Sequence, residues 1–431
     1  MSRLRNRLAA GLALGTLLLT GCASTPIVEL GANPPADLLE QQLWLDAALY
    51  RTPARPGNAV RLLRDGHETF PAMFTAMAQA HDSINLEYYI VQDVHVGGES
   101  LGDLLTRKLH DGVAVNIIMD GFGSRNTDPQ FIARLKQAGA TVLVYHPLTA
   151  EAMLHLENPN DRDHRKIMVV DGRIGFVGGI NLDRVYENRA DPEAAVEGDA
   201  KHAFWTDTDA RIEGPAVADL QRTFFDTWRR QQGPAVAARD YYPRLEDPGP
   251  ETIRIVASAP HQDRPLYYET FLTAVRAARH SVDLGTGFFV PTHQEREELA
   301  RAARRGVAVR LVLPSVSSVP AALAAGRAAY GDLLEAGVRI WEIQFTVLHS
   351  KFATIDGVWT TIGSSNLDRR SVVFNNEVDA VVFGRQTAAA ARAIFDHDIA
   401  KSREITLSAW RNRPLGEKLY ELYARAWEFL M

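Results

Sequence analysis

The chain is organised around His164-Arg165-Lys166-Ile167-Met168-Val169-Val170-Asp171, which returns as His349-Ser350-Lys351-Phe352-Ala353-Thr354-Ile355-Asp356. Both copies read H-x-K-x-x-x-x-D. An Asn follows each His 17 residues later, as Asn181 in Gly-Gly-Ile-Asn and as Asn366 in Gly-Ser-Ser-Asn. The chain has 13 His, so one match could be accidental, but two indicate a duplication. Brought together, two His, two Lys and two Asn would form a phosphate site with its own nucleophile and its own acid.

The residues around each motif predict a β-hairpin. A short apolar run after the Lys ends at Asp-Gly, and a second apolar run follows, over residues 174–177 and 358–362. The His and the Lys are two residues apart at the start of the first strand, so they point to the same face. The Asn follows the second strand, at the neighbouring end of the hairpin. Asp171 and Asp356 open the turns, so they are either structural turn residues or participants in the site.

The duplication extends upstream of the motifs. Residues 83–91 resemble residues 281–290, and each segment leads through a helical stretch to a similar second run, 112–118 and 306–312. Each half therefore reads strand, helix, strand, helix, strand and hairpin. This alternation predicts an α/β fold of two α/β/α halves, related by a pseudo-two-fold axis, with mixed, largely parallel sheets. The axis would bring the two motifs together.

Paired motifs of this kind, followed by G-G-x-N and G-S-x-N, resemble the phospholipase D superfamily from about residue 57 to residue 413. At a finer scale the chain is similar to bacterial cardiolipin synthases. The segments that carry this similarity include Glu87-Tyr88-Tyr89-Ile90, Asp120-Gly121-Phe122-Gly123-Ser124, Trp205-Thr206-Asp207, Asn366-Leu367-Asp368-Arg369-Arg370-Ser371 and Asn375-Asn376-Glu377. Residues 151–161 and Gly285-Thr286-Gly287 depart from the family pattern, which bears on the choice of lipid or acceptor. The resemblance implies two phospholipase D-like halves.

The resemblance also implies a two-step displacement at phosphorus. His164 would be the nucleophile and form a phosphohistidine, and His349 would act as general acid and then as base. The near equivalence of the halves leaves the reverse assignment open. Lys166 and Lys351 would place positive charges on the non-bridging oxygens, where negative charge builds up in the transition state.

Hydrogen-bond donors and orienting acids complete the predicted site. Asn181 and Asn366 would bind the phosphate together with the lysines. Asp207 and Glu377 would each orient the His of the other half, with ordinary turn or surface carboxylates as the alternative. The predicted catalytic set is His164, Lys166, Asp171, Asp207, His349, Lys351, Asp356 and Glu377. Because the lysines supply the positive charge, no metal and no other cofactor is expected.

The N-terminus predicts a lipoprotein signal. Three arginines precede an apolar core, and Leu19-Thr20-Gly21-Cys22 reads as a bacterial lipoprotein cleavage site. Residues 1–21 would be removed, and Cys22, the only Cys, would carry the lipid. This predicts a membrane-anchored lipoprotein facing the periplasm, and Ala23 favours the outer over the inner membrane.

Composition suggests six segments along the chain. They are the signal peptide (1–21), a linker (22–56), the first half (57–231), a linker rich in Pro, Gly and charge (232–251), the second half (252–413) and a C-terminal amphipathic helix (414–431). In the last segment, apolar residues recur at helical spacing beside Tyr420, Trp427 and Phe429. Such a helix suits a membrane interface, and docking on the protein core is the alternative.

The charge of the chain bears on its substrate. Removing residues 1–21 removes three arginines and takes the formal net charge from −6 to −9. A nonspecific nuclease would be expected to present a basic surface to phosphate backbones, so no nucleic-acid partner is expected. A decayed, non-enzymatic duplicate is disfavoured because all six His, Lys and Asn positions are present.

The leading function is therefore a phosphatidyltransferase at a membrane surface that joins two phospholipids. The simplest reaction converts two phosphatidylglycerols to cardiolipin and glycerol, and phosphatidylethanolamine is a further candidate substrate. A phospholipase D-type hydrolase with water as the acceptor is the nearest alternative, and a nuclease or other phosphodiesterase is the second.

Overall fold

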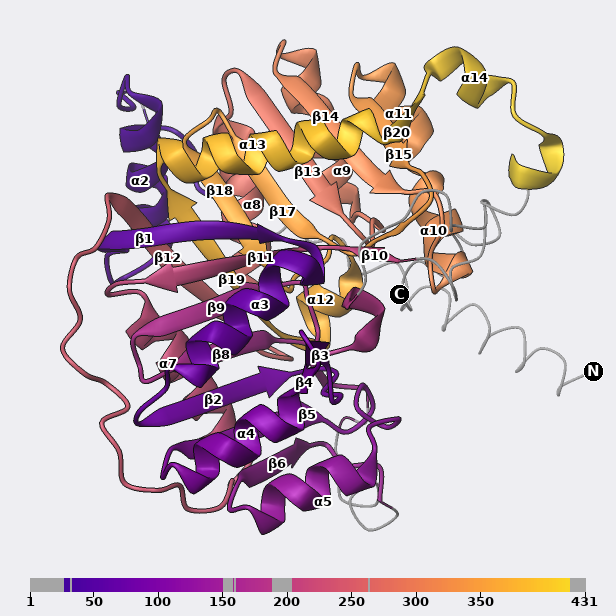
Figure 1. Cartoon of the computed structure of the whole chain (residues 1–431). Coiled ribbons are helices and arrows are strands. Elements are labelled where there is room, and N and C mark those ends of the chain that lie inside the picture. The colour runs from indigo at the N-terminus through magenta and orange to yellow at the C-terminus, as the bar shows by residue number, and fades with distance from the viewer. Residues whose placement is uncertain are drawn as a thin grey trace, which may run out of the picture.

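Two halves that share the order of their main strands and helices make up most of the molecule (Figure 1). The computed structural model describes residues 27–418, except residues 32, 150–157, 159, 188–203 and 263. The first half comprises β1 (Arg55–Arg64), α3 (Asp65–Ala78), β2 (Ser83–Tyr88), β3 (His95–Val96), β4 (Glu99–Ser100), α4 (Leu101–His110), β5 (Ala114–Asp120), α5 (Pro129–Gln137), β6 (Thr141–Tyr145), β7 (Arg162–Asp163), β8 (Lys166–Val170), β9 (Ile174–Gly178), η1 (Arg184–Tyr186), β10 (Trp205–Thr206), β11 (Thr208–Glu213) and α7 (Val217–Arg230). The second half comprises β12 (Glu251–Ser258), α8 (Leu266–Ala277), β13 (Ser281–Thr286), α9 (His293–Arg304), β14 (Ala308–Pro314), α10 (Pro320–Arg327), α11 (Tyr330–Glu335), β15 (Arg339–Ile343), β16 (Val347–Leu348), β17 (Lys351–Ile355), β18 (Trp359–Gly363), α12 (Arg369–Val373), β19 (Asn375–Phe383), α13 (Arg385–Ala400), β20 (Ser402–Ile405) and α14 (Leu407–Arg411).

One continuous sheet runs through both halves. From the centre outward, the first half has the order β1-β11-β9-β8-β2-β5-β6. The second half has the matching order β12-β19-β18-β17-β13-β14-β15, with β20 added at the edge. The two series join where β1 and β12 pair antiparallel. This match confirms the predicted α/β class and its two related halves.

The direction of strand pairing corrects one expectation. In the main ladder, parallel pairing is confined to β2, β5 and β6 and to their counterparts β13, β14 and β15. The other main-ladder pairs between described strands are antiparallel. A sheet that is largely parallel was therefore the wrong expectation. Helical crossovers make neighbours parallel only where they join adjacent strands, whereas the Asp-Gly turns reverse the chain and make the motif strands antiparallel.

The two motif aspartates form the turns of the predicted hairpins β8–β9 and β17–β18. Asp171 has φ 50° and Asp356 has φ 53°, in the left-handed region that Asp tolerates better than most residues. The Asp171 carboxylate accepts three backbone N–H bonds of 2.8 Å from residues 81–83. The Asp356 carboxylate accepts three of 2.7–2.9 Å from residues 279–281. Both aspartates lie at the far end of the hairpin from the His and Lys, so they tie each turn to the adjoining strand.

The predicted N-terminal linker contains a packed helix, α2 (Leu38–Leu49), which the Asp37 side chain caps. Gln41 donates to the backbone oxygen of Ala277 at 3.0 Å, and Asp46 pairs with Arg254 at 2.9 Å. The helix therefore docks on the second half. The predicted signal peptide, Cys22 and residues 419–431 lie outside the described residues. Among the described helices, none has both the length and the apolar character needed to cross a membrane.

Three large apolar clusters support the sheet. One lies under α3, α4 and α5 of the first half, and a second lies under α8, α9 and α11 of the second half. The third draws on strands of both halves and on helices α7 and α13. This shared core includes Ile167 and Val169 of β8 and Phe352 of β17. The strands that begin at the two His-Lys motifs are therefore anchored in the same core.

Candidate active site

Short parallel strand pairs bring each motif to the other half. β7, just before His164, pairs with the start of β19, and the His164 N–H donates to the Asn376 oxygen at 3.0 Å. β10 pairs with β16 in the same way, and the His349 N–H donates to the Thr206 oxygen at 2.8 Å. The residue after each of these acceptors is one of the predicted acids. Backbone pairing thus sets each acid beside the His of the opposite half.

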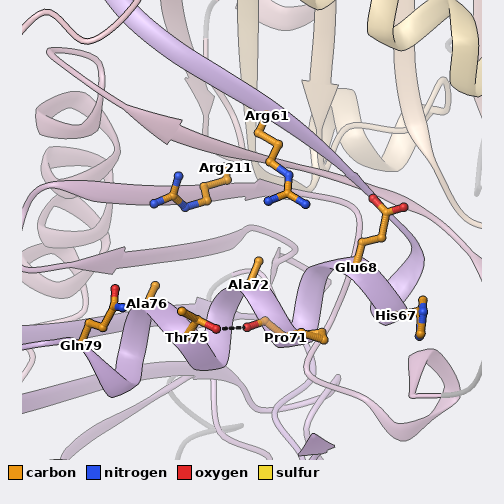
Figure 2. A pocket seen from close by; sticks show the side chains of 9 residues that line it. All are labelled: Arg61, His67, Glu68, Pro71, Ala72, Thr75, Ala76, Gln79 and Arg211. Atoms are coloured by element: carbon orange, nitrogen blue, oxygen red, sulfur yellow. Dashed lines mark hydrogen bonds between the residues drawn. The ribbon is translucent and has the colours of Figure 1, made fainter.

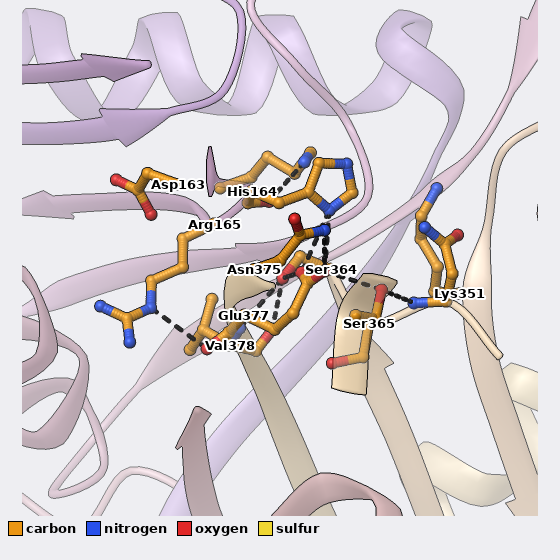
Figure 3. A network of polar contacts seen from close by, with 12 residues as sticks. Asp163, His164, Arg165, Lys351, Ser364, Ser365, Asn375, Glu377 and Val378 are labelled. Carbon is orange, nitrogen blue, oxygen red and sulfur yellow. Dashed lines mark hydrogen bonds and ion pairs between the residues drawn. The ribbon is translucent and has the colours of Figure 1, made fainter. Parts of the chain in front are cut away.

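Each His is held by that acid through Nδ1. Nδ1 of His164 lies 3.1 Å from both carboxylate oxygens of Glu377, and Figure 3 shows the ring directed at this carboxylate. Nδ1 of His349 lies 2.7 Å from Oδ2 of Asp207. The side chains of His164 and His349 are 13% and 7% exposed, so little solvent competes. A carboxylate at Nδ1 fixes the tautomer and turns Nε2 of each ring away from the acid.

The predicted phosphate-binding side chains are buried beside the histidines. Nζ of Lys166 donates to the His164 backbone oxygen at 2.5 Å, and Nζ of Lys351 donates to that of His349. Asn181 accepts a 3.2 Å bond from the Ile90 N–H. Asn366 is also buried, and its side-chain oxygen has no hydrogen-bond partner in the described part of the chain. The structure therefore brings the two His, two Lys and two Asn to one sheet edge.

Burial lowers the pKa values of both His and both Lys side chains. Burial lowers the pKa of His164 to about 4, opposed by Glu377 and reinforced by Lys166. Burial, Lys351 and Lys166 hold the pKa of His349 well below its usual range. Burial also lowers the pKa of Lys166 to about 8 and that of Lys351 to about 7, opposed by nearby acids. An anionic group between these side chains would favour their charged forms.

The two orienting acids differ in their hydrogen bonds. Glu377 also accepts from Ser364 at 2.5 Å and from Asn375 at 3.1 Å (Figure 3). The Ser371 hydroxyl donates to it at 2.8 Å. Burial raises the pKa of Glu377, but the charge and hydrogen bond of His164 and the charge of Lys166 help to outweigh it, and the net pKa is lowered. Glu377 is therefore a carboxylate.

Asp207 has a weaker set of donors. The Thr208 N–H donates to Oδ1 at 2.8 Å, and the Tyr186 hydroxyl lies 3.3 Å from Oδ2. Burial raises the pKa of Asp207 to about 7, although Lys351 and the Thr208 N–H lower it. The two His-acid pairs are thus alike in geometry and different in proton affinity.

Beyond the histidines themselves, sequence reasoning missed the residues that donate to these acids, and two of them occupy equivalent positions in the two halves. The Tyr186 hydroxyl lies 3.0 Å from His349 Nδ1, and Ser371 binds Glu377. Tyr186 and Ser371 are counterparts, because each stands three residues after an Asp that caps a short helix, Asp183 or Asp368. The equal spacing of three residues after the Asp in both halves could have identified this pair from the sequence.

A second pair of buried acids was also missed. Asp209 and Asp379 stand two residues after Asp207 and Glu377, a spacing common to both halves. A Cβ at Gly178 would lie 1.9 Å from Asp209 Oδ1, and one at Gly363 would lie 2.2 Å from Asp379 Oδ1. Burial raises the pKa of Asp379 to about 8 and that of Asp209 well above its usual range. The first Gly of each G-G or G-S sequence therefore makes room for a protonated acid under the site.

Arg165, the middle residue of the first motif, joins the two halves (Figure 3). It is 1% exposed and donates to the backbone oxygens of Glu377 at 3.1 Å and Ser258 at 2.6 Å. It also donates to Thr227 at 2.5 Å and lies 3.4 Å from Glu87. These contacts hold the backbone of the acid that orients His164.

Asp171 and Asp356 are the predicted catalytic residues that the structure does not bring to the site. Their carboxylates bind backbone N–H groups at the far ends of the hairpins. Within the described residues, no group of three or more His, Cys, Asp or Glu is arranged to hold a metal ion. A groove of about 660 Å³ lies elsewhere, between α3 and strands β1 and β11, with Arg61 and Arg211 on its wall (Figure 2).

Comparison with known proteins agrees with this geometry. Residues 73–204 and 271–399 match a family model described as cardiolipin synthase, PLD-like domain. The chain is 31% identical over 389 residues to a cardiolipin synthase of Alkalihalophilus pseudofirmus, covering 89% of this chain and 75% of the relative. It is 32% identical over 386 residues to a cardiolipin synthase of a Geobacillus species, covering 89% and 74%.

Solved structures share the fold at low sequence identity. The phosphatidylserine synthase of Haemophilus influenzae superposes with a TM-score of 0.63 at 13% identity, over 92% of this chain and 100% of that one. The polyphosphate kinase of Porphyromonas gingivalis gives 0.53 at 13% identity, over 96% and 59%. Two related halves with paired His-Lys motifs define the phospholipase D superfamily of enzymes. Within that superfamily, the chain belongs to the cardiolipin synthase family.

Proposed function

We propose that this enzyme transfers a phosphatidyl group from one phospholipid to another through a phosphohistidine, as a cardiolipin synthase. Two phosphatidylglycerols would give cardiolipin and glycerol. The observation that carries the proposal is the crossed arrangement, in which each buried His is oriented by an acid of the other half and accompanied by a buried Lys. The names of the relatives support the choice of lipid.

In the first step, Nε2 of His164 attacks phosphorus and the bond to the leaving glycerol breaks. The ionised Glu377 supports His164 as the nucleophile, because a carboxylate at Nδ1 stabilises the positive charge that the ring gains. His349 donates its proton to the leaving oxygen. Burial and the two lysines hold the pKa of His349 low, and the negative charge of a phosphodiester beside it would raise this pKa.

In the second step, His349 takes a proton from the acceptor hydroxyl, which attacks phosphorus as the bond to His164 breaks. Lys166 and Lys351 bind the non-bridging oxygens in both steps, with Asn181 and Asn366 beside them. Water in place of a lipid hydroxyl would turn the same intermediate into phosphatidic acid. The hydrolase alternative therefore differs only in the acceptor.

Product analysis tests this proposal. Purified enzyme with phosphatidylglycerol in mixed micelles should release glycerol and form cardiolipin, and a short-chain alcohol should divert part of the product to a phosphatidyl alcohol. Phosphatidic acid as the sole lipid product would favour the hydrolase. No turnover of any phospholipid, with turnover of nucleic acid, would contradict both.

We further propose the segment boundaries given above, with α2 as a docked part of residues 22–56, and attachment to a bacterial membrane through lipid on Cys22. Cys22 follows a lipoprotein cleavage sequence and precedes the folded halves. Periplasmic exposure and the slight preference for the outer membrane belong to this proposal.

A further inference from the structure

A pocket separate from the paired histidines lies beside the strand that leads to His349. It has a volume of about 410 Å³ and lies between the end of β15, the turn before β16, the C-terminus of α13 and the start of β20. The lining residues that bear on its chemistry are Arg64, Phe345, Asp398, Lys401 and Arg403. A cavity of this size can hold a small polar headgroup.

Three cationic side chains and one buried carboxyl oxygen without a hydrogen-bond donor among the described residues line this pocket. Arg64, Lys401 and Arg403 line it, and Arg403 lies 3.6 Å from Glu342. Arg64 Nε is in an ion pair with Asp65 at 3.4 Å, and Asp398 Oδ1 is buried without a hydrogen-bond donor in the described part of the chain. Asp398 as a whole is only 2% exposed. Burial raises the pKa of Asp398 to about 7, so the protonated carboxyl can donate a hydrogen bond to an anion held by the three cations.

An exposed aromatic ring marks the mouth of the pocket. Phe345 is 50% exposed, and its φ of 61° places its backbone in the left-handed region. It stands four residues before His349, at the edge of the sheet where the candidate active site lies. An outward aromatic ring beside Lys and Arg is the pattern of a contact with an anionic membrane surface.

The pseudo-two-fold axis supplies a comparison within the molecule. A second pocket lies at the corresponding place, after β6 and at the C-terminus of α7. Its charged lining consists of Arg230 and an Asp161–His261 pair at 3.1 Å. Each pocket has one Asp in its described lining, but the pocket near His349 has three cationic side chains, Arg64, Lys401 and Arg403, where its counterpart has Arg230 and His261. The two duplicated pockets have therefore diverged in charge.

We propose that the pocket beside His349 binds the phosphate group of an anionic phospholipid as a second lipid site. Arg64, Lys401 and Arg403 would bind the phosphate oxygens, and Phe345 would contact the lipid surface. The inference rests on the proposed function only in taking a lipid as the source of the phosphate. Binding at this site requires no turnover.

The pocket is linked to the candidate active site through the start of α3. Nε of Arg64 lies 3.4 Å from Asp65. The Asp207 N–H donates to Asp65 Oδ1 at 3.1 Å, and the Asp65 N–H donates to the Asp207 oxygen at 2.9 Å. A phosphate on Arg64 would thus change the surroundings of the acid that orients His349.

The experiment measures binding of the full chain to phosphatidylcholine vesicles with and without phosphatidylglycerol, by co-sedimentation. The test variant is Lys401→Gln/Arg403→Gln. The matched control is Arg229→Gln/Arg230→Gln, which removes two cations beside the counterpart pocket. The test variant should bind phosphatidylglycerol vesicles about ten-fold more weakly, and the control should bind as the wild type does. Circular dichroism and turnover of a soluble phosphodiester establish that both variants are folded.

Three outcomes would overturn the proposal. Wild-type vesicle binding by the test variant would show that the pocket is not a lipid site. If the control variant bound phosphatidylglycerol vesicles as weakly as the test variant, the loss would reflect general surface charge and not this pocket. If inorganic phosphate bound the wild type through these residues but failed to compete with vesicles, the pocket would be a free-phosphate site. Competition by inorganic phosphate, lost in the test variant only, is the expected result.

Discussion

The acids behind the two histidines give them different chemistry. Glu377, with its serine and asparagine donors, stays ionised beside His164. Asp207 has a pKa raised to about 7 by burial, beside His349. An ionised partner favours the imidazole that gains charge by attacking phosphorus. This difference supports His164 as the nucleophile in halves that are otherwise nearly equivalent.

The pKa values of the site predict a bell-shaped pH dependence of kcat/KM. His164 must be neutral to attack, so activity should fall as the pH drops toward about 4. Lys351 and Lys166 must be charged to bind the phosphate, so activity should fall as the pH rises through about 7 to 8. The measurement is kcat/KM for a p-nitrophenyl phosphodiester across this range. A rate that stays constant well above pH 8 would contradict the role of the buried lysines.

The side chains at the centre of the site could be predicted from sequence because they repeat at fixed spacing. Asp207 and Glu377 were located by resemblance rather than by spacing. Tyr186 and Ser371 were not predicted as site residues, because the two halves have different residue types at this equivalent position. The structural role of Arg165 was not predicted, because its hydrogen-bond partners are mostly backbone oxygens and residues distant in sequence.

The β-hairpin is the element that sets the geometry of the motif. Its turn fixes the strand register, and its open end carries the His, Lys and Asn. Both hairpins could be predicted from the Asp-Gly sequences between apolar runs. The direction of the other strands could not be predicted, because an apolar run does not specify which strand lies beside it in the sheet. Helix α2 was missed since much of its buried face is polar, including Gln41, Gln42 and Asp46.

We predict that Asp171→Ala and Asp356→Ala reduce stability and spare the chemistry. Each substitution removes a carboxylate that accepts three backbone N–H bonds, at an expected cost of about 2–4 kcal/mol. Urea unfolding measures this cost, and kcat per folded molecule should remain near that of the wild type. Asp240→Ala, at an exposed position, is the control. Full stability with kcat lowered a hundred-fold or more would show that the motif aspartates act in catalysis.

The whole molecule makes one site from two incomplete halves. Each half supplies the acid that the other half's His needs, so neither half alone contains a complete His-acid pair. The pseudo-two-fold relation could be inferred from the duplication. The single continuous sheet could not, because nothing in the sequence indicates that β1 pairs with β12.

We predict that chelators leave the purified enzyme fully active, because in the proposed mechanism Lys166 and Lys351 supply the positive charge at the phosphate. The rate on mixed micelles should be unchanged after prolonged treatment with EDTA and removal of the chelator. A loss of activity that only a stoichiometric transition metal restores would refute this account of the site.

We predict that Cys22→Ala blocks lipid attachment and leaves turnover of detergent-dispersed lipid largely intact, because Cys22 precedes the folded halves. Metabolic labelling with palmitate should mark the wild type only. Equal labelling of the variant would place the lipid elsewhere or exclude it.

The central claim, covalent catalysis by His164 with His349 as acid and base, is tested most directly by trapping the intermediate. His349→Ala should be nearly inactive on phospholipid, as should His164→Ala. A p-nitrophenyl phosphodiester has a good leaving group and needs little acid in the first step, so His349→Ala should accumulate an adduct. Rapid quench and mass spectrometry at neutral or basic pH should place the added mass on the peptide containing His164. An adduct on His349 in His164→Ala, with none on His164 in His349→Ala, would reverse the assignment, and a product burst in the wild type with no adduct in either variant would contradict covalent catalysis.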